Sequence, residues 1–161
     1  MSLKRIISGC FIVILWSLLL LLLCSCSHDS NIEQDSPAYA YLEVFKSTVG
    51  DIGEDRIEYI GIDTTKILYG HPSEIKKLFE DYASKYDVSI RWNVKASKCD
   101  YNFFHKGWLI IFEDIELSET KLETNATWMG AVVLASANST YVVEKEAGEW
   151  TITDWKFNWI S

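Results

Sequence analysis

The sequence predicts a single α+β domain, in which N-terminal helices pack on a curved antiparallel β-meander. Two segments before residue 87 carry apolar residues at helical spacing. From residue 88 onward the apolar period falls from about 3.6 residues to about 2, as in strands that bury one face. Helical and β-like segments are largely separated along the chain, and this order is typical of helices gathered on one face of an antiparallel sheet.

Residues 1–25 have the three parts of a secretory signal. Lys4 and Arg5 supply positive charge, an apolar run extends to Leu23, and Ser25 precedes a cysteine. The segment Leu23–Cys26 resembles the bacterial lipobox, which implies cleavage before Cys26 and attachment of lipid to that residue. An uncleaved transmembrane anchor is the alternative, because about 18 apolar residues approach the length that spans a bilayer.

The chain after the signal divides into a tether and a domain. Residues 26–36 are polar and contain no aromatic side chain, so we expect a flexible tether. Residues 37–161 have the length of one domain. Lipid on Cys26 would hold this domain to a membrane of the bacterial cell envelope, facing away from the cytoplasm.

Two helices and an intervening strand are predicted first. Ser36 and Pro37 favour a helix start, and Gly50 ends the apolar run of the helix over residues 37–49. Residues 56–62 are rich in β-formers and predict a strand. Pro72 opens a second helix with one continuous apolar face. That face consists of Ile75, Leu78, Phe79, Tyr82, Ala83 and Tyr86.

Five β-like runs follow. They cover residues 88–95, 108–117, 121–128, 131–145 and 150–160, with a loop expected over 102–107 and a hairpin turn over 146–149. The alternation of apolar residues shifts by one position within the last run. Trp150 and Ile152 have even numbers, whereas three aromatic residues that follow have odd numbers. Those three are Trp155, Phe157 and Trp159. A bulge near Thr153–Asp154 would reconcile the two sets.

The segment Tyr141–Ile152 resembles the closing hairpin of the nuclear-transport-factor-2-like superfamily, also called SnoaL-like or cystatin-like. In that superfamily a tyrosine strand, a glycine–tryptophan turn and a final strand complete a cone-shaped sheet. The stretch Tyr59–Gly70, leading into the helix around Ile75, is similar to the strand, loop and third helix of the same superfamily. The chain departs from the pattern after its first helix, where only residues 51–55 remain for the expected second one.

The resemblance implies a site inside the cone. Enzymes of the superfamily place Asp, His or Tyr there for acid–base chemistry. The candidate cone-facing groups of this chain are Tyr59, Asp63, Asp114 and Tyr141.

Charge and cysteine content narrow the function classes. Without Lys4 and Arg5 the chain keeps 13 basic against 23 acidic side chains, a balance of −10, and no basic face for nucleic acid is evident. With Cys26 acylated and the signal removed, Cys99 is the one thiol left, so no internal disulfide is expected. Cys99, Asp100 and His105 lack the spacing of a structural zinc site, and we expect neither metal nor cofactor.

Tryptophan is abundant after the signal and gives the candidate contact residues. Trp92, Trp108, Trp128, Trp155 and Trp159 would contact a ligand or partner if they line an open sheet face, and would fill the core otherwise. The sequence therefore favours an envelope lipoprotein with a non-catalytic binding module for an unknown protein or small ligand. The alternatives are an enzyme of the resembled superfamily that acts on a small molecule in the concave face, and an acidic immunity or inhibitor protein.

Overall fold

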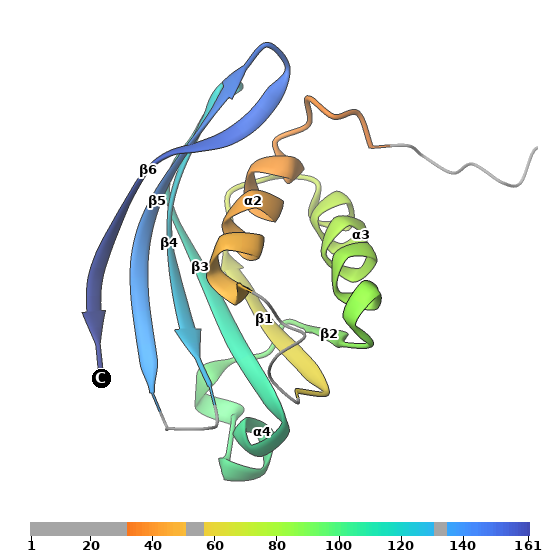
Figure 1. The fold of residues 1–161 in the computed structure, drawn as a ribbon, viewed down its shortest axis with the longest axis vertical. Helices are drawn as coiled ribbons and strands as arrows, with labels where there is room; N and C mark the ends of the chain where they lie inside the picture. The colour runs from red at the N-terminus through yellow and green to blue at the C-terminus, as the bar shows by residue number, and fades with distance from the viewer. Residues whose placement is uncertain (1–31, 51–56, 131–134) are drawn as a thin grey trace, which may run out of the picture. The chain divides into compact units, whose positions relative to one another are not determined.

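The computed structural model describes residues 32–50, 57–130 and 135–161. The chain divides after residue 32, and the unit from Glu33 to Ser161 contains every described helix and strand (Figure 1). The predicted signal, the lipidation site Cys26, most of the predicted tether and the possible helix over 51–55 lie outside the described residues. No described helix is long and apolar enough to cross a membrane.

The elements alternate helices and strands at first and end in four consecutive strands. In chain order they are α2 (Ala38–Val49), β1 (Tyr59–Lys66), α3 (Pro72–Ala83), the 3₁₀ turn η2 (Ser84–Tyr86), β2 (Ser89–Trp92), the 3₁₀ turn η3 (Ala96–Lys98), α4 (Tyr101–Lys106), β3 (Gly107–Leu117), β4 (Lys121–Met129), β5 (Ser136–Glu146) and β6 (Glu149–Ile160). The α+β class predicted from the sequence is confirmed.

The strands form one six-stranded sheet in the order β2-β1-β3-β4-β5-β6. From β3 to β6 the strands pair antiparallel as a meander, whereas β1 pairs parallel with both β2 and β3. The sheet is therefore mixed, and the prediction of a wholly antiparallel sheet is wrong at this edge. The physical reason is the connections: α3 carries the chain from β1 to β2, and η3 and α4 carry it from β2 to β3, so each strand starts again at the same end.

Helices α2 and α3 lie on one side of the sheet, and the strands bend around α2 (Figure 1). We call this side the concave face. The predicted apolar face of the second helix is confirmed in part, because Ile75, Leu78, Phe79 and Ala83 are buried while Tyr86 is 38% exposed. These helices position the core and leave room for a site farther along the sheet.

Aromatic rings from both helices and the sheet make the centre of the core. Phe45 of α2 stacks on Phe79 of α3 with ring centroids 4.3 Å apart. Phe112 of β3 lies 5.9 Å from Phe79 and 6.0 Å, edge-on, from Tyr41. All four rings are fully buried, so the two helices are held to the sheet mainly by apolar and aromatic contacts.

The residues just before α2 contact the domain at its hairpin end. Trp150 of β6 donates its Nε1 hydrogen to the backbone oxygen of Asp35 at 3.1 Å. The hydroxyl of Ser36 donates to Oε2 of Glu74 at 2.5 Å, and the Tyr69 hydroxyl donates to the same oxygen at 2.7 Å. The last two residues of the predicted tether are therefore part of the folded unit.

The predicted bulge in the last strand is confirmed. Ile152 pairs with Val143 and Asp154 pairs with Val142, which leaves Thr153 as the extra residue. This shift brings Trp155 opposite Tyr141, on the face that Trp150 and Ile152 share.

A second shift in β6 changes the prediction for Trp159. Phe157 pairs with Ser139 and Trp159 pairs with Asn138, so Asn158 is an additional extra residue. Trp159 therefore lies on the convex face, and the expectation that it shares a face with Phe157 is wrong. The amide of Asn158 donates to Asn138 at 2.6 Å and to Thr140 at 2.9 Å, which holds the bulge.

The prediction of a loop over residues 102–107 is wrong, because this segment forms most of the short helix α4. Asp100 caps this helix by accepting the backbone N–H of Phe103 at 2.9 Å. Phe103 packs edge-on against Tyr59 with centroids 5.0 Å apart. Helix α4 thus covers the convex side of β1 and β3, opposite α2 and α3.

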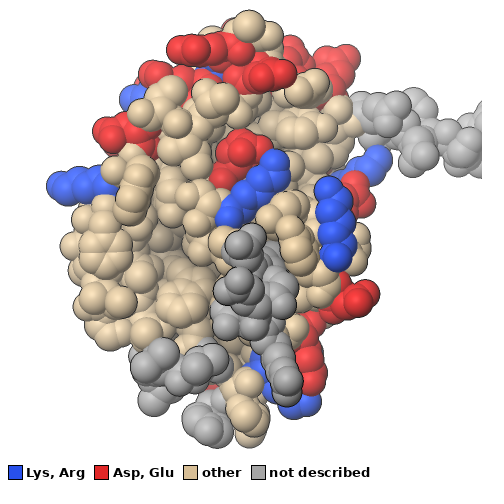
Figure 2. All heavy atoms as spheres, viewed as in Figure 1, with Lys and Arg blue, Asp and Glu red and all other residues tan. Residues whose placement is uncertain are grey.

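Charged side chains are unevenly distributed over the face shown in Figure 2. Acidic groups gather at the top of this view, where the β3–β4 and β5–β6 turns lie. The surface toward the C-terminal half of β6 is largely uncharged in the same view. The cavity described below, between α2 and the sheet, has no charged side chain in its lining.

Candidate functional site

Successive side chains of a strand point alternately to the concave and the convex face of the sheet. The strand register therefore tells which residues lie on the concave face. β3 contributes Trp108, Ile110, Phe112 and Asp114; β4 contributes Leu122, Thr124, Ala126 and Trp128; β5 contributes Ala137, Ser139, Tyr141 and Val143. Helices α2 and α3 cover the middle of this face. Toward the C-terminal end of α2 the cover ends, and a cavity remains.

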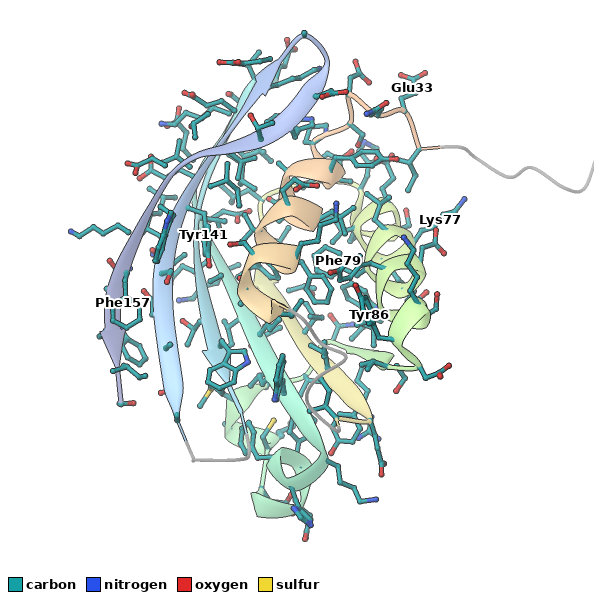
Figure 3. The ribbon with its side chains drawn as sticks, in the orientation of Figure 1. Glu33, Lys77, Phe79, Tyr86, Tyr141 and Phe157 are labelled. Atoms are coloured by element: carbon teal, nitrogen blue, oxygen red, sulfur yellow. The ribbon has the colours of Figure 1, made fainter. Side chains whose placement is uncertain are left out.

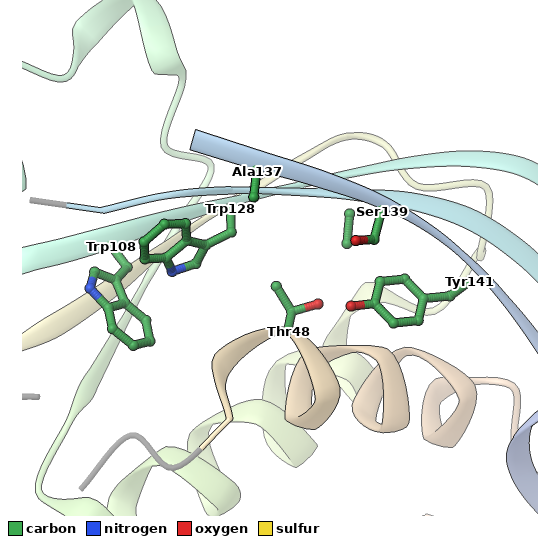
Figure 4. Close-up of a pocket in the computed structure, with 7 residues that line it drawn as sticks. Thr48, Trp108, Trp128, Ala137, Ser139 and Tyr141 are labelled. Atoms are coloured by element: carbon green, nitrogen blue, oxygen red, sulfur yellow. The ribbon is translucent and has the colours of Figure 1, made fainter. Parts of the chain in front are cut away.

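The cavity has a volume of about 240 Å³ and lies between α2 and strands β3, β4 and β5 (Figure 4). The residues that line it are Thr48, Trp108, Ala126, Trp128, Ala137, Ser139 and Tyr141. At one end the rings of Trp108 and Trp128 meet edge to face, 5.5 Å between centroids. At the other end the hydroxyls of Thr48 and Tyr141 point toward one another (Figure 4).

The cavity hydroxyls are incompletely hydrogen-bonded. Thr48 donates its hydrogen to the backbone oxygen of Val44 at 2.8 Å, so its oxygen remains free to accept. Tyr141 is only 6% exposed, and its hydroxyl has no hydrogen-bond partner among the described residues. The same holds for the hydroxyl of Ser139 within the described chain. Hydroxyls that bond no protein group can bond water or another molecule, so the two unpaired hydroxyls that open on the cavity make it a candidate binding site.

An exposed apolar surface on β6 neighbours two residues of the cavity lining. Phe157 pairs with Ser139 and Ile160 pairs with Ala137, so these two side chains share the face of the cavity lining. Phe157 is 50% exposed and Ile160 is 67% exposed. We call these two residues the β6 shelf. Figure 3 shows Phe157 at the open edge of the sheet and Tyr141 on the side of β5 that faces α2.

The four cone-facing candidates are split between the two faces of the sheet. Tyr141 lines the cavity, and Asp114 lies on the concave face beneath α2. Tyr59 and Asp63 lie on the convex face, because Ile60 and Ile62 take the inward positions of β1. The structure therefore does not bring these four groups together.

Each of the two convex candidates is satisfied locally. The Tyr59 hydroxyl donates to the backbone oxygen of Phe103 at 2.6 Å. Asp63 Oδ1 accepts the backbone N–H of Thr65 at 3.0 Å and its hydroxyl at 2.7 Å. Both contacts fix the chain around β1, which is a structural role.

Asp114 holds the loop after β1 against α2. Its Oδ2 accepts the hydroxyl of Tyr41 and, at 2.7 Å, the backbone N–H of Leu68. Its Oδ1 is buried without a hydrogen-bond partner among the described residues. Burial, followed by the hydrogen bond and charge of Asp114, raises the pKa of Tyr41 well above its usual value, so the hydroxyl remains a donor.

The five candidate tryptophans separate into three environments. Trp108 and Trp128 line the cavity. Trp92 is half-buried against Phe79, 5.8 Å between centroids, and donates to Glu80 at 3.0 Å. Trp155 and Trp159 are 60% and 44% exposed on β6. Only the first pair lines the concave cavity, and Trp92 belongs to the edge of the core.

A second hollow, of about 320 Å³, lies over β4, β5 and β6 and includes the convex side chains of Glu123, Val142 and Lys156. Its hydroxyl and amide groups bond to each other, since Thr140 donates to Asn125 at 2.7 Å and accepts from Asn158. The exposed ring of Trp155 also contributes to its lining, although Trp155 pairs with the concave residue Tyr141 in the strand register. The neutral hydroxyl and amide groups of this hollow are therefore already paired, whereas the side chains of Asp154 and Lys156 bond no described residue.

The thiol and imidazole groups of the described chain belong to no metal-binding cluster. No group of three or more His, Cys, Asp and Glu residues among the described residues is placed to hold a metal ion. Burial, and then the charges of Asp100 and Asp63, raise the pKa of Cys99, so its thiol is a poor nucleophile at neutral pH. His71 lies at the start of α3 beside the Tyr69 ring, 5.5 Å between centroids.

Sequence reasoning missed Thr48, Ser139 and the β6 shelf. Ser139 could have been found from the alternation of β5, because it shares parity with Tyr141. Thr48 stands near the end of an amphipathic helix, where the sequence alone does not say which turn the sheet leaves uncovered. No family model matches the chain, and no curated protein or solved structure gives a significant match.

Proposed function

We propose that the chain is the precursor of a bacterial envelope lipoprotein, and that its α+β domain is a non-catalytic binding module. The lipid on Cys26 would hold the domain to a membrane, facing away from the cytoplasm. The ligand or partner would be taken on the concave face of the sheet. The observation that carries the binding proposal is the cavity of about 240 Å³, with unpaired hydroxyls inside and an apolar shelf at its edge.

The chemistry of the lining supports binding. Tyr141 is the one titratable side chain among the seven described residues that line the cavity. Hydroxyls and indole rings recognise a ligand by hydrogen bonds and apolar contact, the combination found in small-molecule sites. The second candidate function, an enzyme acting in the same cavity, depends on Tyr141 as its acid or base. Under that alternative Tyr141→Phe would abolish turnover of a substrate that still binds.

We also propose that the domain is related to the nuclear-transport-factor-2-like group. In support, helices cover the concave side of a bent sheet, and the chain ends in the long β5–β6 hairpin. The turn of that hairpin contains Ala147 and Gly148 at positive φ, the backbone conformation of a tight two-residue hairpin turn. The parallel pairing of β1 with both neighbours is a feature that the resemblance did not predict.

The anchoring proposal is tested with two cysteine variants. Cells expressing the full chain are labelled with a palmitate analogue, and the chain is followed through membrane fractionation. Cys26→Ala should remove the label and leave an unprocessed precursor, because the acylated cysteine would be gone. Cys24→Ala is the matched control and should label like the wild type, since that residue leaves with the signal. Equal labelling of both variants would refute the anchor at Cys26.

The binding proposal is tested by filling the cavity. Ser139→Leu places a larger apolar side chain among Ala126, Ala137 and the indole rings, and Ser97→Leu is the exposed control on η3. Each variant is expressed as the full lipidated chain and crosslinked in intact cells. The species that become crosslinked to the two variants are then compared. Loss of the crosslinked species in Ser139→Leu alone supports the concave site. Unchanged crosslinking of a folded Ser139→Leu chain contradicts it.

A further inference from the structure

The cavity has a polar end whose hydrogen-bonding capacity is defined. The hydroxyls of Tyr141 and Ser139 can each donate and accept, while Thr48 can only accept, because its hydrogen is given to Val44. Tyr141 is more than nine-tenths buried and aims this unpaired hydroxyl across the cavity toward α2 (Figure 4). A ligand group that both accepts and donates, or that accepts two bonds, would satisfy this end.

Away from these hydroxyls, small and aromatic side chains line the cavity. Ala126 and Ala137 make the floor, and the rings of Trp108 and Trp128 close the far wall. At roughly 30 Å³ for each water-sized group, 240 Å³ holds about eight non-hydrogen atoms. A longer apolar chain could leave the cavity across Ala137 and lie on the β6 shelf.

Charge selects among the molecules that would fit. None of the seven described residues lining the cavity carries a charged side chain. Moving an ion from water into such a place costs several kcal/mol or more unless an opposite charge meets it. The chain as a whole has a net charge of −8, which further disfavours an anion. The lining therefore suits an uncharged ligand.

We propose that the concave cavity binds a neutral amphiphile, an aliphatic chain that carries a hydroxyl or ester group. The polar group is held by Tyr141 and Ser139, and the chain passes over Ala137 to the β6 shelf. This assignment rests on the proposed binding function and names its ligand class. It assigns the two unpaired hydroxyls and the exposed Phe157 and Ile160 to one ligand.

The test uses the chain from residue 26 onward with Cys26→Ser, which contains the whole folded unit and needs no detergent. The probe is 1-octanoylglycerol, kept below the concentration at which it aggregates, with binding measured by titration calorimetry and by chemical shifts. Octanoate and octylammonium have the same chain with a negative or positive end, and glycerol has the polar group alone. We expect 1-octanoylglycerol to bind at one site, with the two ions at least tenfold weaker and glycerol showing no binding.

Three variants test whether 1-octanoylglycerol binds in the concave cavity. Tyr141→Phe removes one hydrogen bond and should weaken binding of 1-octanoylglycerol about three- to tenfold. Tyr86→Phe is the matched control, because Tyr86 is partly exposed on η2, outside the cavity lining, and should bind like the wild type. Ser139→Leu should abolish binding. Each variant is checked for native circular dichroism and cooperative unfolding, so a misfolded chain is not counted.

The outcomes separate this inference from the proposed function. Octanoate or octylammonium binding as tightly as the ester would overturn the neutral ligand class, as would unchanged affinity in Tyr141→Phe. If no amphiphile binds the folded chain, the inference fails. In that case the cell crosslinking of Ser139→Leu still decides whether the concave face binds something else.

Discussion

Removing the Tyr41 hydroxyl should weaken the contact between α2 and the end of β3. Tyr41 is fully buried and donates to Asp114, whose other oxygen already lacks a partner among the described residues. Tyr41→Phe keeps the ring against Phe112 but leaves the carboxylate with the N–H of Leu68 as its remaining described donor. Hydrogen bonds to charged groups contribute about 1.5–3 kcal/mol, and we expect a loss of this size.

Urea unfolding of the chain from residue 26 onward, with Cys26→Ser, measures this loss directly. Tyr39→Phe is the matched control, because Tyr39 is also on α2, is half-buried and makes no hydrogen bond through its hydroxyl to a described residue. In an Asp114→Asn background the hydroxyl would meet a neutral acceptor, so Tyr41→Phe should then cost only about 0.5–1.5 kcal/mol. A Tyr41→Phe chain as stable as Tyr39→Phe, or an equal cost in both backgrounds, would refute this account of the contact.

Three further changes test other parts of the fold. Gly107→Ala should destabilise the domain strongly or prevent folding, because a Cβ there would overlap the Tyr59 ring and backbone; a melting temperature near that of the wild type would contradict the packing. Asp100→Ala should cost about 0.5–2 kcal/mol by removing the cap of α4, measured by denaturant unfolding. Glu74 has a lowered pKa, chiefly because the Ser36 hydroxyl donates to it, so its contribution is present above the unfolded pKa and lost as pH falls through the folded one. The difference in melting temperature between the wild type and Glu74→Gln should therefore be larger at pH 7 than at pH 3, and an equal difference would oppose this reasoning.

Local patterns predicted the elements that depend on short-range physics. The helix at Pro72 was predictable from apolar spacing, because burial of one face dictates which residues recur. The bulge at Thr153 was predictable because two sets of apolar residues on opposite parity had to reach one face. In both cases the apolar pattern that supports the prediction lies within a short stretch of the sequence.

Pairings and sites that depend on distant segments were not predictable. The parallel partners of β1 are set by where α3 and α4 return the chain, which no alternation within β1 records. The bulge at Asn158 is held by amide bonds to β5 and keeps Trp159 off the concave face. The cavity exists because α2 ends above Ser139 and Tyr141, and the length of a helix relative to a sheet is a tertiary property. Helix α4 was missed although Asp100 is a suitable cap, because the segment is only six residues long.

Among the described strands, β6 is a long outer strand that pairs with β5 alone, and outer strands tend to recruit other chains into continuous sheets and fibrils. Its exposed aromatic side chains would add to that tendency. The extra residues Thr153 and Asn158 interrupt the strand on both sides of Asp154–Phe157, so only a short regular stretch presents its free backbone groups. Deleting Asn158 would lengthen that stretch and turn Trp159 and Ile160 over. Bulges of this kind hinder the addition of another strand to a sheet edge, and here they would do so while the aromatic rings of β6 stay exposed.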